Sequence, residues 1–276
     1  SNRSTTKGLL GKDYKMPVAL APVGLLGMQK ANGEILAAQA AETFGVPFTL
    51  STMSICSIEE VARNTSEPFW FQLYVMRDHD FAKRLVERAK AVECSALVLT
   101  LDLQILGQRH ADIRNGLSVP MKIKMSNVFD LISKPNWCFE MAKSKNRTFG
   151  NIMGHVKDIK NLTSLTKWVQ SQFDPKLNWD DVKRIKDWWG GKLIIKGIMD
   201  PDDAKMAQKC GADALVVSNH GGRQLDGVNS SISMLPQIKK AVSDIAVYFD
   251  GGISSGQDIL KAIALGAEGV MIGRSF

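Results

Sequence analysis

The chain has 276 residues, 45% of them hydrophobic and 23% charged, which is an ordinary globular composition with enough apolar residues for one large core. No run approaches 18 uninterrupted apolar residues and the first residues lack the apolar centre of a signal peptide, so the sequence shows neither a transmembrane helix nor a secretion signal. Ten Lys and Arg against four acids place +6 of the net charge of +7 in residues 115–178.

Short apolar runs recur along the chain, most of them bounded by turn residues and too short for helices. They are rich in Val, Ile, Leu and Phe, as buried parallel strands are, and we count eight: Met16–Leu20, Val46–Leu50, Phe69–Leu73, Ala96–Leu101, Leu193–Ile195, Ala214–Val217, Ala246–Phe249 and Val270–Ile272. Helical patterns lie between them, and residues 33–45, 201–211 and 255–266 each end at a glycine. Eight βα units predict an α/β fold, a closed (β/α)8 TIM barrel.

The spacing of the strands is interrupted once, because more than 90 residues separate the fourth strand from the fifth. We interpret residues 115–178 as a loop insertion within a single barrel domain of residues 1–276. The chain begins without Met and stops directly after the eighth strand. We therefore expect a barrel core that is truncated at both ends and lacks its eighth helix.

The four cysteines are scattered, and none forms a CxxC or lies at metal-ligand spacing from a His. We expect reduced, structural thiols in a cytoplasmic protein, and no metal site.

Polar residues, glycines and one Pro-Val pair collect at the carboxyl ends of the predicted strands, where barrels of this kind place their active sites. These residues are Pro22, Val23, Gly24, Ser51, Gln72, Tyr74, Thr100, Asp102, Lys196, Ser218, His220, Asp250, Gly251, Gly252, Gly273 and Arg274, with Arg109 and Arg223 just beyond. So many unusual groups on one rim predict a functional site.

The pattern DGGISSGQDI followed by GVMIGR is typical of phosphate binding. Gly251, Gly252 and Gly273 let backbone N–H groups approach an anion, a helix that starts near Ser255 presents its positive end, and Arg274 adds charge. Plain turns that use Gly for geometry are the alternative, but a phosphate site after strands seven and eight recurs in barrels.

Acid–base chemistry is predicted by VVSNHGGRQLDG, residues 216–227. His220 is a candidate general base that Asp102 can orient, although a structural histidine is the alternative. Arg109 and Arg223 can bind a carboxylate through paired hydrogen bonds. Lys196 follows an apolar strand, so it needs an anionic partner unless solvent reaches it.

These segments resemble one family. SNHGGRQLDG, LIIKGI, FQLYV, LTLD, MPVALAPVG and DGGISSGQDILKAIALGAEGVMIGR are similar to motifs of the FMN-dependent α-hydroxy-acid oxidases and dehydrogenases, which include glycolate oxidase, L-lactate dehydrogenase and (S)-mandelate dehydrogenase. The resemblance covers most of the chain outside residues 115–178. It implies FMN-dependent oxidation of an L-2-hydroxy acid, lactate-like or mandelate-like, to the 2-oxo acid, with electrons passed to a quinone or another acceptor.

The resemblance also implies roles for the rim residues. His220 takes a proton as the base, Asp102 stabilises the imidazolium, and Lys196 stabilises reduced FMN. The residues implied to bind or contact substrate are Arg109, Arg223 and Tyr74. Those implied to hold FMN are Pro22, Val23, Gly24, Ser51, Gln72 and Thr100 at the isoalloxazine, and Ser218, Asp250, Gly251, Gly252, Gly273 and Arg274 at the ribityl and phosphate.

Two residues depart from common family patterns. Ser254 stands where many members have Arg, which removes one phosphate-binding charge. Gly24 stands where the oxidases have Ala, and this favours a dehydrogenase with an acceptor other than oxygen.

In the basic segment 115–178 the cations are interleaved with Met and aromatic residues that include Met121, Met125, Phe129, Trp137, Phe139, Met141 and Phe149. This segment is either a lid with a solvated basic face or a peripheral contact with the inner face of the cell membrane. The family further implies a homo-oligomer, often a tetramer, and no nucleic-acid motif accompanies the charge.

Other functions stay open beside the hydroxy-acid reaction. One is another flavin or nucleotide-phosphate barrel, such as a type 2 isopentenyl diphosphate isomerase or IMP dehydrogenase, against which SNHGGRQLD and Arg109 argue. Another is a catalytically incomplete fragment that binds FMN weakly.

Overall fold

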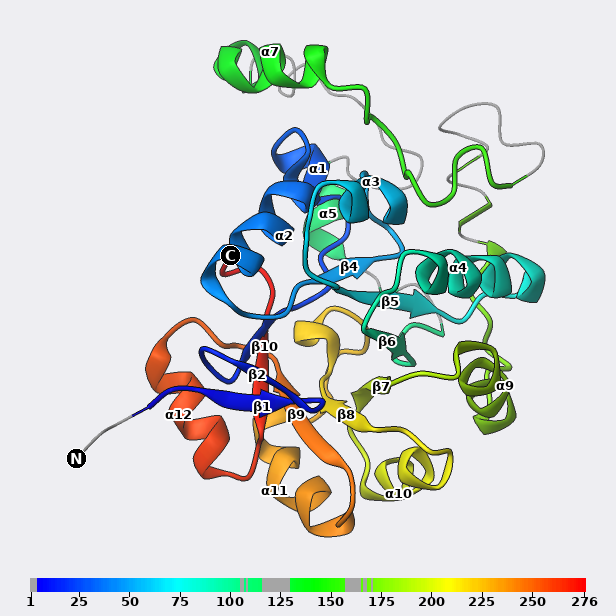
Figure 1. Cartoon of the computed structure of the whole chain (residues 1–276), viewed down its shortest axis with the longest axis vertical. Coiled ribbons are helices and arrows are strands. Elements are labelled where there is room, and N and C mark those ends of the chain that lie inside the picture. The colour runs from blue at the N-terminus through cyan, green and yellow to red at the C-terminus, as the bar shows by residue number, and fades with distance from the viewer. Residues whose placement is uncertain are drawn as a thin grey trace.

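The computed structural model describes residues 4–104, 107, 109–115, 130–156, 165, 168–169 and 171–276. Within these ranges, eight parallel strands form one sheet in the order β3-β10-β9-β8-β7-β6-β5-β4. A parallel bridge between Leu20 and Phe48 joins the β3 and β4 ends of this sheet, so it closes into a barrel. Figure 1 shows the helices arranged around the outside of the strands, as the predicted (β/α)8 barrel requires.

Every predicted barrel strand is present, and the bounds differ by a few residues at most. They are β3 (Val18–Leu20), β4 (Thr49–Ser51), β5 (Trp70–Tyr74), β6 (Ala96–Thr100), β7 (Leu193–Ile198), β8 (Ala214–Val217), β9 (Ala246–Asp250) and β10 (Gly269–Ile272).

The described helices are α1 (Leu26–Gln29), α2 (Gly33–Phe44), α3 (Ile58–Arg63), α4 (His79–Ala91), α5 (His110–Arg114), α7 (Pro135–Lys143), α9 (Trp179–Trp189), α10 (Pro201–Lys209), α11 (Ser231–Ala241) and α12 (Gly256–Ala264), with a 3-10 turn η1 (His220–Gly222). Side chains cap several of them: Asp200 accepts from backbone N–H groups at the start of α10, and Ser255 does so at α12. Gly45 ends α2 in the left-handed conformation, at φ 83°.

A hairpin that the sequence analysis missed closes the amino end of the barrel. Strand β1 (Lys7–Leu9) pairs antiparallel with β2 (Lys12–Tyr14). Leu9 is buried within the interior cluster, and the N–H of Leu10 donates to the Tyr248 hydroxyl at 3.1 Å. A Cβ added at Gly269 would lie 2.8 Å from Leu9 Cδ2, so the hairpin fills this end tightly.

The barrel interior has an apolar layer and a polar layer. The apolar residues at its amino end include Leu9, Ala19, Trp70, Ala96, Val98, Ile194, Ala214, Val216, Tyr248 and Met271. Side chains two residues apart on a strand share a face. The next inward positions toward the carboxyl ends are therefore Gln72, Thr100, Lys196, Ser218 and Asp250. Strand alternation thus places the predicted site residues inside the mouth of the barrel.

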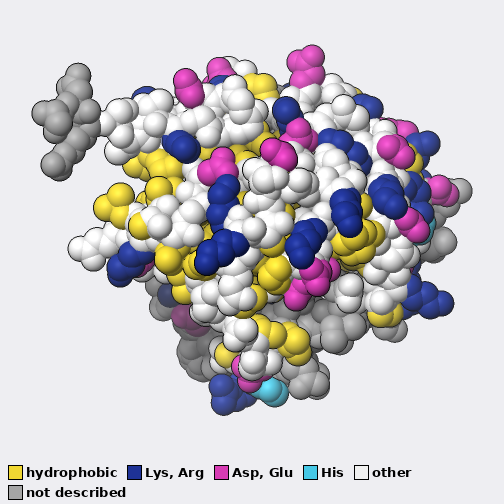
Figure 2. All heavy atoms as spheres, turned by 90° about the horizontal axis from the view of Figure 1, so that it is seen from below, with side chains coloured by type: hydrophobic (Ala, Val, Ile, Leu, Met, Phe, Trp, Pro, Cys, Tyr) yellow, Lys and Arg dark blue, Asp and Glu magenta, His cyan; other side chains and the backbone are white. Residues whose placement is uncertain are grey.

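Part of the insertion is described. Helix α7 stands apart from the strands, beyond α1 (Figure 1), where the Trp137 indole donates to the Met28 carbonyl at 3.1 Å and Lys30 pairs with Glu140 at 2.5 Å. Met121, Met125 and Phe129 lie outside the described residues. Figure 2 shows Lys and Arg interspersed with Asp and Glu on the face seen from below in Figure 1, so positive charge does not dominate that face.

Candidate active site

His220 and Asp102 form the acid–base pair of the rim. His220 Nδ1 lies 2.8 Å from Asp102 Oδ1. His220 has a left-handed backbone, at φ 58°, and its N–H donates to Ser218 Oγ at 3.1 Å. Gly197 makes room for the carboxylate, since a Cβ there would lie 2.8 Å from Asp102 Cβ. Because Nδ1 faces Asp102, Nε2 is the ring nitrogen left for a substrate proton.

Lys196 is buried and bound to an anion, as its position predicted. Its ammonium lies 2.8 Å from Asp250 Oδ2 and 3.1 Å from Ser218 Oγ, and that hydroxyl donates to Asp250 at 2.8 Å. Burial alone would lower the pKa of Lys196, but the carboxylates of Asp250 and Asp102 outweigh it and hold that pKa above its ordinary value. Burial would raise the pKa of Asp250, and Lys196 outweighs it in turn. Both groups therefore stay ionised at neutral pH.

Tyr74 ends strand β5 at the same mouth. Burial raises the pKa of its phenol to about 12, and the nearby Asp102 carboxylate adds to the rise. The hydroxyl therefore stays protonated and can donate a hydrogen bond.

The two arginines lie on loops that pack against each other. A Cβ at Gly107 would lie 2.5 Å from the Arg223 carbonyl oxygen, so the loop after β6 touches the loop after β8. Arg109 Nη2 donates to Gln224 Oε1 at 3.1 Å. Gln224 was not assigned a role from sequence, although its place beside Arg223 in the motif was a usable signal.

A pocket of about 460 Å³ lies where the phosphate site was predicted. Its lining includes Gly251, Gly252 and Arg274, together with Ser230, Ser231 and Ile232 at the start of α11. Gly251 and Gly252 have φ of 128° and 72°, values that favour glycine. Arg274 Nη2 also donates to the Gly221 carbonyl at 3.4 Å. Glycines, a cation and the start of a helix give this pocket the character of an anion site.

The expected role of α12 needs a correction. Its first turn is occupied by Asp258, whose carboxylate accepts from the Ser254 N–H and from the hydroxyls of Ser254 and Ser255, at 2.9 to 3.2 Å. Helix α12 contributes Asp258 and Lys261 to the pocket lining, whereas α11 contributes its first two residues, Ser231 and Ile232, with Ser230 just before them. The helix start that faces the pocket is therefore that of α11.

The sequence profile of the FMN-dependent dehydrogenases matches residues 1–276. The chain belongs to the FMN-dependent dehydrogenase family. It is 47% identical to the L-lactate dehydrogenases of Haemophilus influenzae strains PittEE and 86-028NP, over all of this chain and 73% of each relative. Among solved structures it is similar to (S)-mandelate dehydrogenase, described as a monotopic membrane protein, with 35% identity and a TM-score of 0.92 over all of this chain and 73% of that one. Mandelate oxidase follows at 35% identity and a TM-score of 0.80, over 99% and 69%.

The mouth of the barrel fits the FMN that this family uses. Gln72 Nε2 and Thr100 Oγ1 are buried and have no hydrogen-bond partner in the described part of the chain. A buried polar group left unsatisfied costs about 1–3 kcal/mol, so two at one place indicate that a polar ligand completes them. Gly24 lies beside Ser51, which donates to Gln72: a Cβ added at Gly24 would lie 3.4 Å from Met53 Cβ and 4.0 Å from Ser51 Oγ, in ordinary van der Waals contact.

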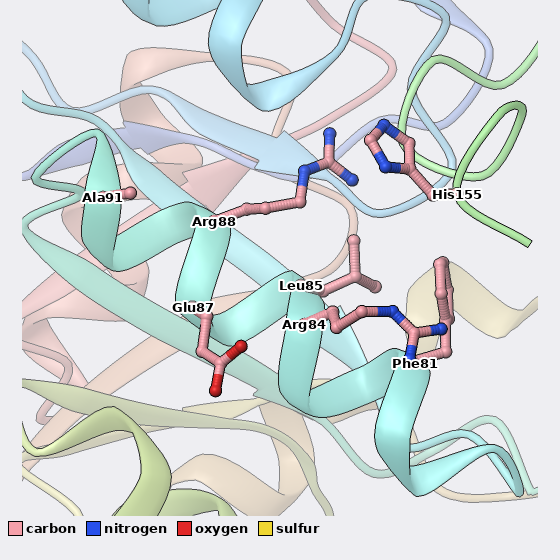
Figure 3. Close-up of a pocket in the computed structure, with 7 residues that line it drawn as sticks. All are labelled: Phe81, Arg84, Leu85, Glu87, Arg88, Ala91 and His155. Carbon is pink, nitrogen blue, oxygen red and sulfur yellow. The ribbon is translucent and has the colours of Figure 1, made fainter.

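A second pocket of the dehydrogenase lies away from these residues. It has about 330 Å³ and is lined by Phe81, Arg84, Leu85, Glu87, Arg88 and Ala91 of α4 and by His155 (Figure 3). None of the predicted site residues lines this second pocket.

Proposed function

We propose that this dehydrogenase oxidises an L-2-hydroxy acid, lactate-like or mandelate-like, to the 2-oxo acid, with residues 1–276 acting as one FMN-binding domain. The contact between His220 Nδ1 and Asp102 Oδ1, at 2.8 Å, carries the proposal because it leaves a histidine base at the mouth of a flavin barrel. Bound FMN supplies the two-electron acceptor. The related L-lactate and (S)-mandelate dehydrogenases support this substrate class, and the isomerase-like alternative is not favoured.

In this proposal His220 Nε2 takes the substrate proton, and the Asp102 carboxylate stabilises the imidazolium that forms. Arg109 and Arg223 bind the substrate carboxylate, and the protonated Tyr74 donates to the substrate. The Lys196 ammonium supplies fixed positive charge where negative charge develops on reduction.

The proposed FMN contacts form two sets. Pro22, Val23, Gly24, Ser51, Gln72, Thr100 and Lys196 surround the ring system. Ser218, Asp250, Gly251, Gly252, Gly273 and Arg274 hold the ribityl chain and phosphate. The glycine conformations and the anion pocket beside Arg274 support the second set.

An anaerobic visible spectrum tests the reaction. The flavin of the purified chain should bleach on addition of L-lactate or (S)-mandelate, and the relative rates rank the substrates. His220→Gln should keep its flavin and bleach about 100- to 10,000-fold more slowly, the usual contribution of a general base. His79→Gln, on the exposed surface of α4, is the matched control. Flavin that stays oxidised with both acids, or bleaching at the wild-type rate in His220→Gln, would contradict the proposal.

We further propose that a tetramer of this enzyme contacts the inner face of the cell membrane through α7 and passes electrons to a quinone. Three apolar side chains at α7 and the turn before it are exposed: Leu131, Ile132 and Phe139. Lys143 lies over the Phe139 ring, with its ammonium 4.0 Å from the ring centroid. A cation beside exposed apolar side chains is the combination that binds helices to the surface of anionic bilayers. The monotopic (S)-mandelate dehydrogenase supports the membrane part. No helix in the described ranges is long and apolar enough to span a bilayer.

Co-sedimentation with vesicles that contain anionic lipid tests this contact. Ile132→Ser with Phe139→Ser should release the protein, whereas Leu260→Ser, an equally exposed leucine on α12, should not. Equal sedimentation of the α7 variant and the wild type would exclude α7 as the contact.

A further inference from the structure

Asn151, in the insertion, reaches the wall of the proposed flavin site. It is fully buried and follows Gly150, whose N–H donates to the Ser54 carbonyl at 3.2 Å. A Cβ at Gly150 would lie 2.6 Å from the Ile55 carbonyl oxygen. The insertion is therefore pressed against the loop between β4 and α3, far along the chain from its own strand.

The acceptor half of the Asn151 amide anchors it to the outside of the barrel. Oδ1 accepts from the Ile58 N–H at 2.9 Å and from Arg88 Nη2 at 3.3 Å. Arg88 also donates Nη1 to the Asn151 carbonyl at 3.0 Å, and Glu59 holds the guanidinium at 2.6 and 2.8 Å. Figure 3 shows the Arg88 side chain extending from α4 toward His155, which follows Asn151 by four residues.

The donor half of the same amide, Nδ2, faces the turn after β4 that borders the proposed flavin site. Nδ2 lies 3.0 Å from Ser54 Oγ, 3.4 Å from the Ser51 carbonyl and 3.5 Å from the Thr52 carbonyl. These contacts hold the turn that carries Ser51 and Thr52.

That turn in turn fixes Gln72. Ser51 Oγ and the Thr52 N–H both donate to Gln72 Oε1, at 3.2 and 3.3 Å. With Oε1 held by two donors, the buried Nε2 is directed toward the barrel mouth, where it has no partner in the described part of the chain.

We propose that Asn151 is a positioning residue for the flavin: through Ser51 and Thr52 it orients the Gln72 amide so that Nε2 donates to the FMN ring. This inference rests on the proposed placement of Gln72 against FMN. A donor to the ring favours the electron-rich reduced state, so a misplaced Gln72 lowers both the affinity for FMN and the reduction potential of the bound flavin.

Asn151→Asp separates the two halves of the amide. The carboxylate keeps the acceptor that meets Ile58 and Arg88, but it has no N–H to give to Ser51, Thr52 and Ser54. Asn146→Asp is the matched control, because it makes the same change in the same segment and its Nδ2 meets only Cys56 Sγ, at 3.8 Å, among the contacts described.

We expect Asn151→Asp to raise the Kd for FMN about tenfold, equivalent to about 1.4 kcal/mol, and to lower the flavin reduction potential, while Asn146→Asp changes neither. Wild-type Kd and potential in Asn151→Asp would overturn the inference. If Asn151→Asp does not fold, Ser54→Ala removes the shortest acceptor of the amide and must shift both quantities the same way.

Gln72→Leu keeps this test distinct from that of the proposed function. If Gln72→Leu lowers the potential and Asn151→Asp does not, Gln72 contacts FMN and only the inference fails. If neither variant moves the potential, the placement of Gln72 against FMN is itself wrong, and the inference falls with it.

Discussion

Replacing Lys196 by Met tests the electrostatics of the barrel mouth. The ammonium is 4% exposed and lies 2.8 Å from the Asp250 carboxylate. At an effective dielectric constant of about 20, two charges at this distance attract by about 6 kcal/mol, and desolvation of both ions offsets much of it. Removing one partner leaves the other charge buried and unpaired, which usually costs about 3–5 kcal/mol. We therefore expect Lys196→Met to lose that much unfolding free energy at neutral pH.

The sign of the pH dependence follows from Asp250. In the wild type Lys196 holds the pKa of Asp250 below its ordinary value despite burial. In Lys196→Met burial dominates and raises that pKa, so the folded state binds the proton more tightly than the unfolded state does. The stability of the variant must then fall as pH rises above the ordinary value of 3.8 for an Asp carboxyl. The deficit relative to wild type should be larger at pH 8 than at pH 5.

Urea unfolding followed by circular dichroism, extrapolated to zero FMN concentration, measures this deficit without a contribution from cofactor affinity. Lys196→Met with Asp250→Asn removes both charges and should recover most of the loss. A deficit below about 1 kcal/mol, or one that shrinks as pH rises, would refute the ion-pair reasoning.

Three further predictions concern the wall, the cofactor face and the base of the barrel. The hydrogen bond from Arg88 lowers the pKa of Glu59 to about 2 from an ordinary 4.5, so its stabilisation is present above pH 4.5 and is lost as pH falls toward 2. Because the Glu59 side chain is 35% exposed, Glu59→Gln should lose only about 1–2 kcal/mol of unfolding free energy in urea at pH 7, and a larger loss at pH 3.5 would contradict this. Gly24→Ala should fold normally, since the added Cβ meets Met53 at 3.4 Å, an ordinary van der Waals contact. Its reduced flavin should reoxidise severalfold faster in air in stopped-flow measurements. An unchanged rate would show that Gly24 does not determine whether oxygen serves as the electron acceptor. Leu9→Ala should lose about 2–5 kcal/mol in urea unfolding with an unchanged FMN Kd, and a loss near zero would show that the hairpin is not part of the core.

The barrel strands were predictable because each must be buried on both faces and therefore appears in the sequence as a short apolar run. The hairpin of β1 and β2 was not, since its three-residue strands contain Lys7, Lys12 and Asp13 and bury little besides Leu9. The position of the hairpin is set by the amino end of the barrel, which is formed by residues far from the hairpin in sequence. A local pattern carries no information about that end.

The site was predictable to the same extent and for a related reason. Parallel strands end on one rim, so residues such as Asp102 and His220 could be brought together from their positions alone. The capping role of Asp258 could not be predicted. A helix whose first turn is occupied by its own carboxylate has the same sequence pattern as a helix whose first N–H groups are free. The role of Asn151 could not be predicted either, since nothing near it in sequence indicates that the insertion returns to the loop after β4.

The alternation of strand side chains explains why stability and chemistry occupy one barrel without competing for the same positions. Trp70 and Gln72 are two residues apart on β5 and point the same way, one into the apolar layer and one into the mouth. Polar groups at the mouth weaken the fold unless they are satisfied, and Lys196 with Asp250 satisfy each other before any ligand arrives. Gln72 Nε2 and Thr100 Oγ1 have no such partner in the described part of the chain. The polar groups of the mouth that lack a hydrogen bond are therefore those proposed to face the flavin ring. Cofactor binding should therefore stabilise this barrel most strongly at the ends of β5 and β6.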